Sequence, residues 1–345
     1  MLLLKSLRFL IIIFVILSLS FCNRNKDYSY QKVSNSYGGT DVLKQLSIEK
    51  EIILDSGTDI IGHIFAFTMI EDNFLIVDSL HSRQCYLFDN NGRLIKKIGK
   101  YGEGPGEYLI VLAACYVNDR IFLIENYKIK IYKKNGEFLF GKKRPFIGLC
   151  NGAYAGSNGN ILALSFNRYN IQKDTIFQLD MDGNLIKSFS PVDDVPEVFD
   201  TFYPQTGLCI EKDRLFQIFN FKYELAEFDN NGNKIRDIKL TSPFYTPPDY
   251  SRAKVKGHKA EKEYRASFTQ VVGFYKHSKG YASLLTNWQS IKEPQNIFEF
   301  FNKDFQRIGY FELNKDELPL GVYNDRIISA DFENETKLIF RKIIL

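Results

Sequence analysis

From about residue 46 onward, short runs of apolar and aromatic residues alternate with brief polar segments. Some runs are apolar at every second position, and others are apolar throughout, as in residues 74–77 (FLIV) and 121–124 (IFLI). These two patterns are typical of half-buried and fully buried β-strands. No helical period interrupts them until about residue 249. The chain is therefore predicted to consist almost wholly of strands.

A glycine-containing turn returns four times between these strands, at Gly92, Gly136, Gly183 and Gly232, with spacings of 44, 47 and 49 residues. The dipeptide is Asn-Gly three times and Asp-Gly once, which suits a type I′ hairpin whose two central residues both have positive φ. A hairpin that recurs at this interval predicts a repeat fold, and a four-stranded propeller blade has about this length.

The strands group into six blades. The final group, after residue 313, has only three strands, and an isolated strand at 47–54 supplies the fourth as the outer strand of blade six. This arrangement closes the ring and protects its open edges. We predict an all-β fold, a six-bladed β-propeller of four-stranded blades whose N-terminal strand closes the last blade. The five complete blades are expected at 63–98, 111–141, 149–189, 206–240 and 269–313.

The N-terminus reads as a targeting segment. Lys5 and Arg8 precede an apolar run at 9–19 that is too short for a comfortable membrane span. Residues 19–22 (Leu-Ser-Phe-Cys) resemble a bacterial lipobox, although Phe21 stands where a small residue is usual. We expect a lipoprotein signal at 1–22, lipidation of Cys22, a polar tether at 23–46 and the propeller at 47–345, placing the protein in the cell envelope, on the outer membrane. An ordinary signal peptide or an uncleaved anchor is the alternative.

The charge balance and the cysteine content say little about which kind of molecule the protein binds. Without Lys5 and Arg8, 43 basic residues face 41 acidic ones, so nothing predicts a nucleic-acid partner. Apart from Cys22, the cysteines are far apart and form no C-x-x-C pair. Cys115, Cys150 and Cys209 occupy apparently equivalent strands, and we interpret them as small buried side chains near the axis, with a disulfide between blades left open.

One junction between blades carries a more specific resemblance. Residues 86–99 (YLFDNNGRLIKKIG) are followed by KYGEGPGEY at 100–108. This resembles an NHL-type repeat and, more closely, the bacterial six-bladed β-propeller lipoproteins with one well-preserved Gly-Pro-Gly junction. The resemblance implies an exported ring on a lipid anchor, and it implies no reaction or catalytic residue.

Motifs for chemistry are sparse. Residues 102–107 (GEGPGE) lack the Lys-Ser/Thr and the following helix of a phosphate loop, so we interpret them as a structural connection. The histidines, one each at 63, 81, 258 and 277, show no metal-ligand spacing, and no nucleophile elbow occurs. Acidic residues at strand ends are interpreted as turn caps. These acids are Asp78, Glu125, Asp180 and Asp229. No metal, cofactor or catalytic residue is predicted.

The lengths of the connections favour one face of the ring. Strands of each blade are lettered A to D from the axis outward, so the A–B and C–D turns share one face, the tight-turn face. The B–C and D–A connections share the other, the long-loop face, where long links are expected at 79–83, 99–110, 166–174, 190–205, 241–268 and 287–295. Loops on a rigid scaffold carry function, so this face is predicted to bind ligand. Its candidate residues are Trp288, Arg168, Tyr169, His81, Arg83, Tyr203, Tyr250, Arg252 and Gln289.

The insertion at 241–268 between blades four and five is predicted to contain a basic helix at 250–265. This helix is interpreted as a lid, as a contact for an anionic partner, or simply as a solvated helix that covers the ring. The leading hypothesis for function is a non-enzymatic binding module for a glycan, peptide or protein. The alternatives are a propeller enzyme (hydrolase, lactonase or lyase, with or without a metal) and a scaffold in an envelope complex.

Overall fold

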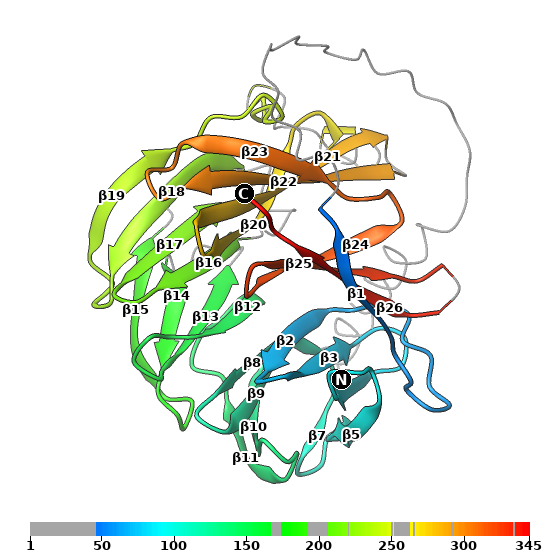
Figure 1. Cartoon of the computed structure of the whole chain (residues 1–345). Coiled ribbons are helices and arrows are strands. Elements are labelled where there is room, and N and C mark those ends of the chain that lie inside the picture. Colours follow the sequence, from blue (N-terminus) through cyan, green and yellow to red (C-terminus); the bar gives the residue numbers. More distant parts are fainter. Residues whose placement is uncertain are drawn as a thin grey trace.

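The computed structural model describes residues 46–166, 174–191, 206–219, 221–249, 251, 263–264, 266–290, 293–333 and 335–345. Six four-stranded antiparallel sheets are arranged in a ring (Figure 1). The prediction of a six-bladed propeller is confirmed.

The first three blades follow one another along the chain. Blade one contains β2 (Ala66–Ile70), β3 (Asn73–Asp78), β4 (Gln84–Phe88) and β5 (Leu94–Ile98). A connection with two short paired strands, β6 (Lys100–Tyr101) and β7 (Glu107–Tyr108), leads to blade two. Blade two contains β8 (Val111–Val117), β9 (Arg120–Glu125), β10 (Lys128–Lys133) and β11 (Phe138–Lys143). Blade three contains β12 (Leu149–Ala155), β13 (Ile161–Phe166), β14 (Asp174–Leu179) and β15 (Leu185–Pro191).

The second half repeats the pattern. Blade four contains β16 (Thr206–Glu211), β17 (Arg214–Phe219), β18 (Lys222–Asp229) and β19 (Lys234–Lys239). Blade five contains β20 (Gln270–His277), β21 (Gly280–Ser290), β22 (Glu293–Asn302) and β23 (Arg307–Glu312). Blade six contains β24 (Glu317–Tyr323), β25 (Arg326–Asp331), β26 (Lys337–Lys342) and β1 (Ile48–Ile53).

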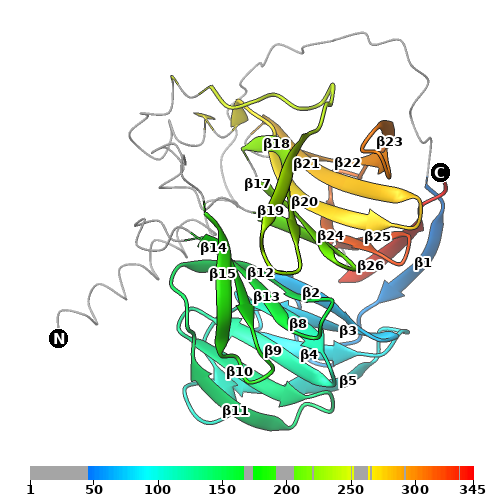
Figure 2. The same cartoon turned by 90° about the vertical axis from the view of Figure 1, so that its left-hand side faces the viewer.

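The inner strand of each blade lies beside the axis in Figure 1, and the outer strand lies at the rim. The inner strands are β2, β8, β12, β16, β20 and β24. Blades two and five lie on opposite sides of the ring, with β8–β11 below and β20–β23 above in Figure 2. Sequence order around the ring is therefore also spatial order, as in a propeller.

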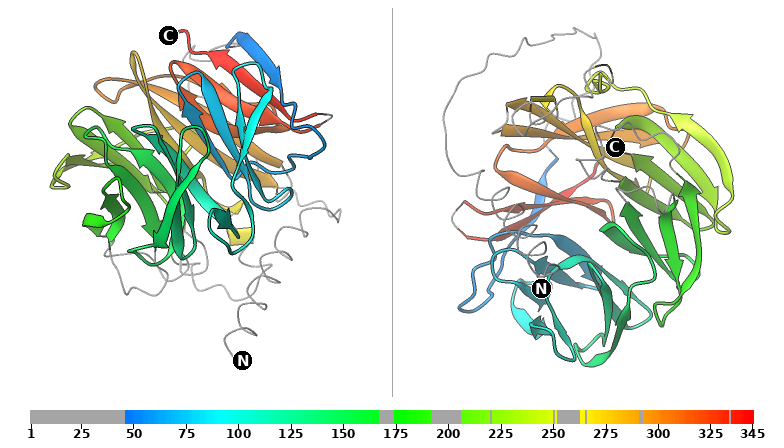
Figure 3. Two further views of the ribbon diagram at one scale, coloured as in Figure 1. Left: turned by 90° about the horizontal axis from the view of Figure 1, so that it is seen from below. Right: turned by 180° about the vertical axis from the view of Figure 1, so that it is seen from behind.

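Closure of the ring joins the two ends of the described chain. Ile52 of β1 pairs with Leu338 of β26 in antiparallel register, and Glu49 accepts two hydrogen bonds from Arg326, at 2.7 and 2.8 Å. Figure 3 shows the blue β1 beside the red C-terminal strands. The predicted role of residues 47–54 as the outer strand of blade six is confirmed.

The recurrent glycine turns differ in type from the prediction. In the first of them Gly92 has φ +84°, while Asn91 is not among the residues with positive φ. The register of β4 and β5 shifts between Leu87 and Phe88, so the turn is a three-residue loop with a bulge rather than type I′. The Asp89 carboxylate favours this form because it accepts the amides of Asn91 and Arg93 at 2.8 and 3.0 Å.

Type I′ geometry occurs instead in A–B turns. Asn118 and Asp119 both have positive φ (47° and 58°), and so do Asn324 and Asp325 (45° and 59°). Asn and Asp tolerate this region better than other residues with a side chain. These short turns leave the ends of the inner strands uncovered by connecting chain.

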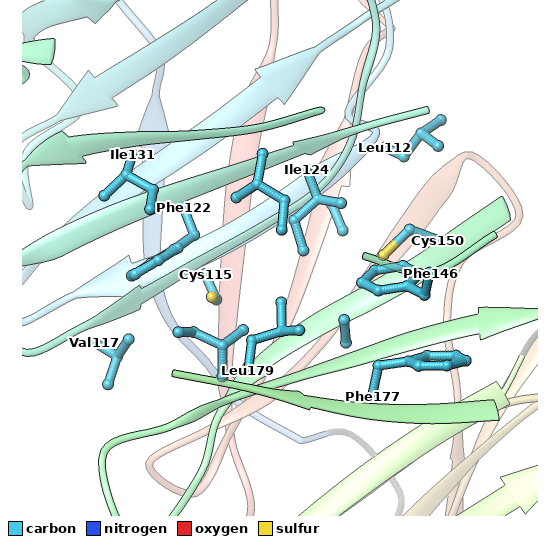
Figure 4. Packing of buried hydrophobic residues seen from close by; sticks show 14 residues of the cluster. Leu112, Cys115, Val117, Phe122, Ile124, Ile131, Phe146, Cys150, Phe177 and Leu179 are labelled. Atoms are coloured by element: carbon cyan, nitrogen blue, oxygen red, sulfur yellow. The ribbon is translucent and has the colours of Figure 1, made fainter. Parts of the chain in front are cut away.

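The core is divided among the interfaces between neighbouring blades. One cluster joins blades two and three, where the rings of Phe146 and Phe177 stack with centroids 4.7 Å apart. Figure 4 shows Cys115 and Cys150 in this cluster as separate side chains. Each blade thus buries both faces against its neighbours, which fixes the positions of the six inner strands around the axis.

Candidate functional site

The inner strands enclose a cavity of about 1120 Å³ on the axis of the ring. All six blades contribute, through β2, β8, β12, β16, β20 and β24. In β20 and β24 the lining begins at Phe274 and Leu320, in the second half of these two strands, and continues to the A–B turns at Ser278 and Asn324. The cavity therefore extends toward the tight-turn face.

Two tyrosines lie over glycines inside this cavity. A Cβ built on Gly152 would come 2.8 Å from Cε2 of Tyr154, and one built on Gly273 would collide with the end of the Tyr275 ring. In each pair the tyrosine is two residues after the glycine and shares its side of the strand. The Tyr275 ring also reaches blade six, where its Cε1 atom would be 3.0 Å from a Cβ on Gly321. The missing side chains thus let both rings lie along the cavity wall.

The phenol groups of these tyrosines stay protonated. Burial raises the pKa of Tyr154 to about 12, although a hydrogen bond with the backbone of Leu208 acts in the opposite direction. Burial also raises the pKa of Tyr275, and the nearby Tyr154 adds to the effect. Both rings line the cavity, so they offer it a flat apolar face and a neutral hydroxyl group.

Charged groups gather at the mouth, where they are paired with one another. Lys276 lies 2.8 Å from Glu211, and Glu71 pairs with Lys134 of the next blade. Burial raises the pKa of Tyr116 to about 12, and its hydroxyl donates to Asp119 at 2.8 Å.

Asp325 and His277 meet at the same mouth. Burial acts to raise the pKa of Asp325, but hydrogen bonds from Ser278 and the charge of Arg326 hold it below its ordinary value. Burial lowers the pKa of His277. Its Nδ1 atom accepts the Lys279 amide at 3.2 Å, and its Nε2 atom lies 3.0 Å from the Tyr281 carbonyl. This arrangement fits a neutral imidazole with the proton on Nε2.

The sequence-predicted site residues are only partly described. His81 and Arg83 lie in the exposed β3–β4 connection on the long-loop face, and neither lines the axial cavity. The Arg83 guanidinium sits over the Tyr101 ring at 4.9 Å from its centroid. The His81 ring packs where a Cβ on Gly62 would be. Ligand binding at this face stays a prediction.

Trp288 and Gln289 lie in a strand rather than in the predicted loop at 287–295. The β21–β22 hairpin continues to Ser290 and Glu293, with Trp288 opposite Pro294. Proline has no backbone N–H to donate, and it is tolerated here because β23 pairs with β22 only from Ile297 onward. No hydrogen bond from residue 294 to β23 is therefore needed. The side chains of both residues lie outside the described part of the structure.

Several other predictions also fall outside the described residues. These are the signal segment, the tether except its last residue, most of the helical insertion, and the following site residues: Arg168, Tyr169, Tyr203, Tyr250, Arg252 and the lipidation site Cys22.

The Gly-Pro-Gly junction is a structural connection, as predicted. Glu107 folds back so that its carboxylate accepts the Gly104 amide at 2.8 Å and pairs with Lys100 at 3.0 Å. The Tyr108 hydroxyl donates to the Ile98 carbonyl and accepts the Cys85 amide, at 2.9 and 2.8 Å. The conspicuous motif therefore fixes blade one against blade two.

Cysteines and strand-end acids also have structural settings. The four described cysteines are buried and unbridged, and Cys115 and Cys209 line the cavity. Asp78 caps its loop by accepting the amides of Leu80, His81 and Ser82. Within the described part of the chain, no three His, Cys, Asp or Glu side chains are grouped to hold a metal ion. No helix in the same part is long and apolar enough to cross a membrane.

The sequence carries one signal for this cavity. The pattern Gly-x-Tyr occurs in three of the inner strands, at 152–154, 273–275 and 321–323. Glycine weakens a strand unless another group approaches its backbone closely. At Gly152 and Gly273 the ring two residues later lies over the glycine, whereas Gly321 makes room for the Tyr275 ring of the neighbouring blade.

Known structures share this fold at low sequence identity. A protein from Bacteroides fragilis, provisionally described as exported, has 13% identity and a TM-score of 0.65 over 86% of this chain and 95% of its own. A DUF4221 family member from Bacteroides vulgatus has 13% identity and a TM-score of 0.61 over 86% and 97%. Virginiamycin B lyase from Staphylococcus aureus has 12% identity and a TM-score of 0.53 over 85% and 99%. These likenesses show the fold alone.

No curated protein matches the sequence. The sequence profile of one family, DUF5128, described as a 6-bladed beta-propeller, matches residues 56–339, which is most of the chain. The ring of six sheets found here has the architecture that this description gives. The chain belongs to the DUF5128 family of six-bladed β-propellers.

Proposed function

We propose that this protein is an exported, lipid-anchored binding module that holds its ligand in the axial cavity. The observation that carries the proposal is the cavity itself, about 1120 Å³ lined by side chains from all six blades. Ligand sites are concave, largely apolar and aromatic, and contain a few polar groups that orient the ligand. This cavity is concave, its wall carries aromatic side chains, and its lining mixes apolar with polar groups.

The export part of the proposal rests on the sequence, through the signal-like residues 1–22 and the lipobox-like Cys22. The likeness to a Bacteroides protein provisionally described as exported is compatible with it. An envelope location would give the tight-turn face access to molecules that arrive from outside the cell.

A tryptophan placed at the mouth tests the cavity. Ala155 is exposed and lines the cavity at the end of β12, so Ala155→Trp should obstruct entry without disturbing the core. The matched control is Ile95→Trp, because Ile95 is 51% exposed on the outer strand of blade one. We expect Ala155→Trp to weaken binding by about tenfold or more, and Ile95→Trp to leave it unchanged.

The measurement is a thermal-shift panel of oligosaccharides, peptides and small metabolites with the full-length protein in detergent, followed by titration of each hit. A ligand bound equally well by wild type and Ala155→Trp, but lost in Arg83→Ala, would place binding on the long-loop face and overturn the proposal. A panel without any hit would also count against a small-molecule site.

A further inference from the structure

We infer that the ligand of the axial cavity is an uncharged saccharide, whose ring rests on Tyr154 and Tyr275. The inference rests on the proposed function, since it names the ligand class of the same cavity. Three features of the wall support it: the posture of the two tyrosines, the protonation of their hydroxyl groups, and the pairing of the charges at the mouth.

The first supporting feature is the position of the two tyrosine rings. Because the glycine has no side chain, the ring of a tyrosine two residues farther along the strand can lie close against the strand backbone. Tyr154 does this over Gly152, while Tyr275 spans Gly273 and the Gly321 backbone of blade six. Both rings are partly exposed and line the cavity, so this exposed surface faces the channel. The cavity thus has two flat aromatic platforms.

A flat aromatic face selects a ligand with a matching surface. The face of an aromatic ring is electron-rich, so it attracts weakly positive C–H groups. A pyranose ring carries such C–H groups on its flat side, and hydroxyl groups around its edge. The neutral phenols of Tyr154 and Tyr275 can donate to and accept from those hydroxyl groups. One platform therefore satisfies both the apolar and the polar parts of a sugar.

The charges at the mouth argue against an ionic ligand. Lys276 is paired with Glu211, Glu71 with Lys134, and Asp325 accepts the Ser278 amide. Burial also keeps His277 neutral by lowering its pKa. A charged ligand would have to give up its hydration for groups that already have partners, which is costly. A neutral ligand with many hydroxyl groups meets no such penalty.

The cavity mouth at the tight-turn face is open to a saccharide. The A–B turns around it are short, two residues in β8–β9, β20–β21 and β24–β25, so connecting chain does not narrow the entrance there. Along β20 and β24 the lining starts only at Phe274 and Leu320, whereas along β2 and β8 it covers most of the strand. A saccharide would enter from the tight-turn face and reach the tyrosines.

The test is isothermal titration of the full-length protein with neutral oligosaccharides, an oligogalacturonide as the acidic counterpart, and a tyrosine-rich peptide. Neutral oligosaccharides of several linkages should bind at millimolar concentration or below. Tyr154→Leu and Tyr275→Leu should each weaken binding about tenfold, and Tyr154→Phe and Tyr275→Phe less, since the platform is kept and one hydroxyl is lost. Tyr101→Leu, on the long-loop face, should have no effect.

The outcomes separate the inference from the proposed function. If only the acidic oligosaccharide or the peptide binds, and Ala155→Trp abolishes that binding, the saccharide class is wrong and the cavity remains the site. If a neutral saccharide binds but neither the tyrosine variants nor Ala155→Trp matter, both are wrong. If no neutral saccharide binds to correctly folded wild-type protein, the inference is overturned. Thermal melts of the Tyr→Leu variants show whether lost binding reflects lost folding.

Discussion

Burial decides the chemistry of the cysteines at the residue scale. Cys85, Cys115, Cys150 and Cys209 are buried and free. Burial raises the pKa of Cys85 and Cys209 to about 12 and that of Cys150 to about 11. Because the thiolate is the reactive form, a raised pKa makes these groups poor nucleophiles near neutral pH.

We predict that these four thiols react slowly with iodoacetamide in the native protein at about pH 8, and all react after unfolding in denaturant. Mass spectrometry of the peptides measures both states, and the unfolded sample is the control for reagent activity. A peptide pair joining Cys115 to Cys150 in non-reduced protein would contradict the structure and restore the disulfide alternative.

Single residues of the site were the least predictable from sequence. Composition and spacing indicated buried cysteines and capping acids, and both are found. The platforms were missed because Tyr154 and Tyr275 are ordinary strand residues, and their role depends on glycines of the same strand and of the next blade. A comparison of loop lengths cannot find such a site, because the site lies in the channel between the inner strands and not in the connections.

At the scale of elements, β1 shows how the alternation of one strand decides its contribution. Ile52 is 4% exposed and belongs to the cluster between blades six and one, whereas Ile53 is 56% exposed on the opposite side of the strand. Because both residues are isoleucine in the same strand, the same substitution at each position distinguishes the effect of burial from that of strand propensity.

We predict that Ile52→Thr lowers the free energy of unfolding by about 2 kcal/mol, because it removes one buried methyl group and replaces a buried methylene with a hydroxyl. Ile53→Thr should change it by no more than about 0.5 kcal/mol. Threonine keeps the β-branched shape in both cases. Chemical denaturation of the two variants beside wild type measures the difference, and equal effects would show that β1 does not close the ring in solution.

Most elements could be predicted because local rules and the fold agree. Alternation placed the strands of the complete blades to within a few residues, and the glycine turns set their phase. The hairpin around Trp288 was mistaken for a loop because Pro294 and its polar neighbours read as turn residues. Only the end of β23 shows that this proline needs no hydrogen-bond partner on that side.

At the scale of the whole molecule, the sequence predicted the ring and its closure but not where the ring is hollow. The repeat length specifies the number of blades, and six inner strands leave a channel that their side chains fill to different extents. Small residues at the bulges of β12, β20 and β24 (Gly152, Gly273 and Gly321) help to shape this channel. How much space remains depends on all six blades together.

The stability of the ring should depend on pH through His277, which is 4% exposed. Burial lowers its pKa in the folded protein, outweighing the Tyr281 carbonyl and Asp325, which favour the charged form, while Lys279 also disfavours it. When the folded-state pKa is lower than the unfolded one, the unfolded chain takes up a proton first as the pH falls. The contribution of His277 to stability is therefore full above about pH 7 and declines as the pH falls through 6.5.

We expect His277→Gln to reduce the loss of unfolding free energy between about pH 7.5 and pH 5.5. Glutamine keeps the capacity to donate and accept hydrogen bonds, yet carries no charge at either pH. Denaturation curves of wild type and variant at both pH values measure the effect, and the values near pH 7.5 show what the substitution itself costs.

Burial raises the pKa of Glu125 and Glu299, so these carboxyl groups stabilise the fold more as the pH falls through this range. Since those carboxyl groups are present in both proteins, the difference between the two pH profiles isolates His277. Parallel profiles would mean that the imidazole has the same proton affinity in the folded and unfolded chains, and that the mouth of the cavity is more hydrated than its packing indicates.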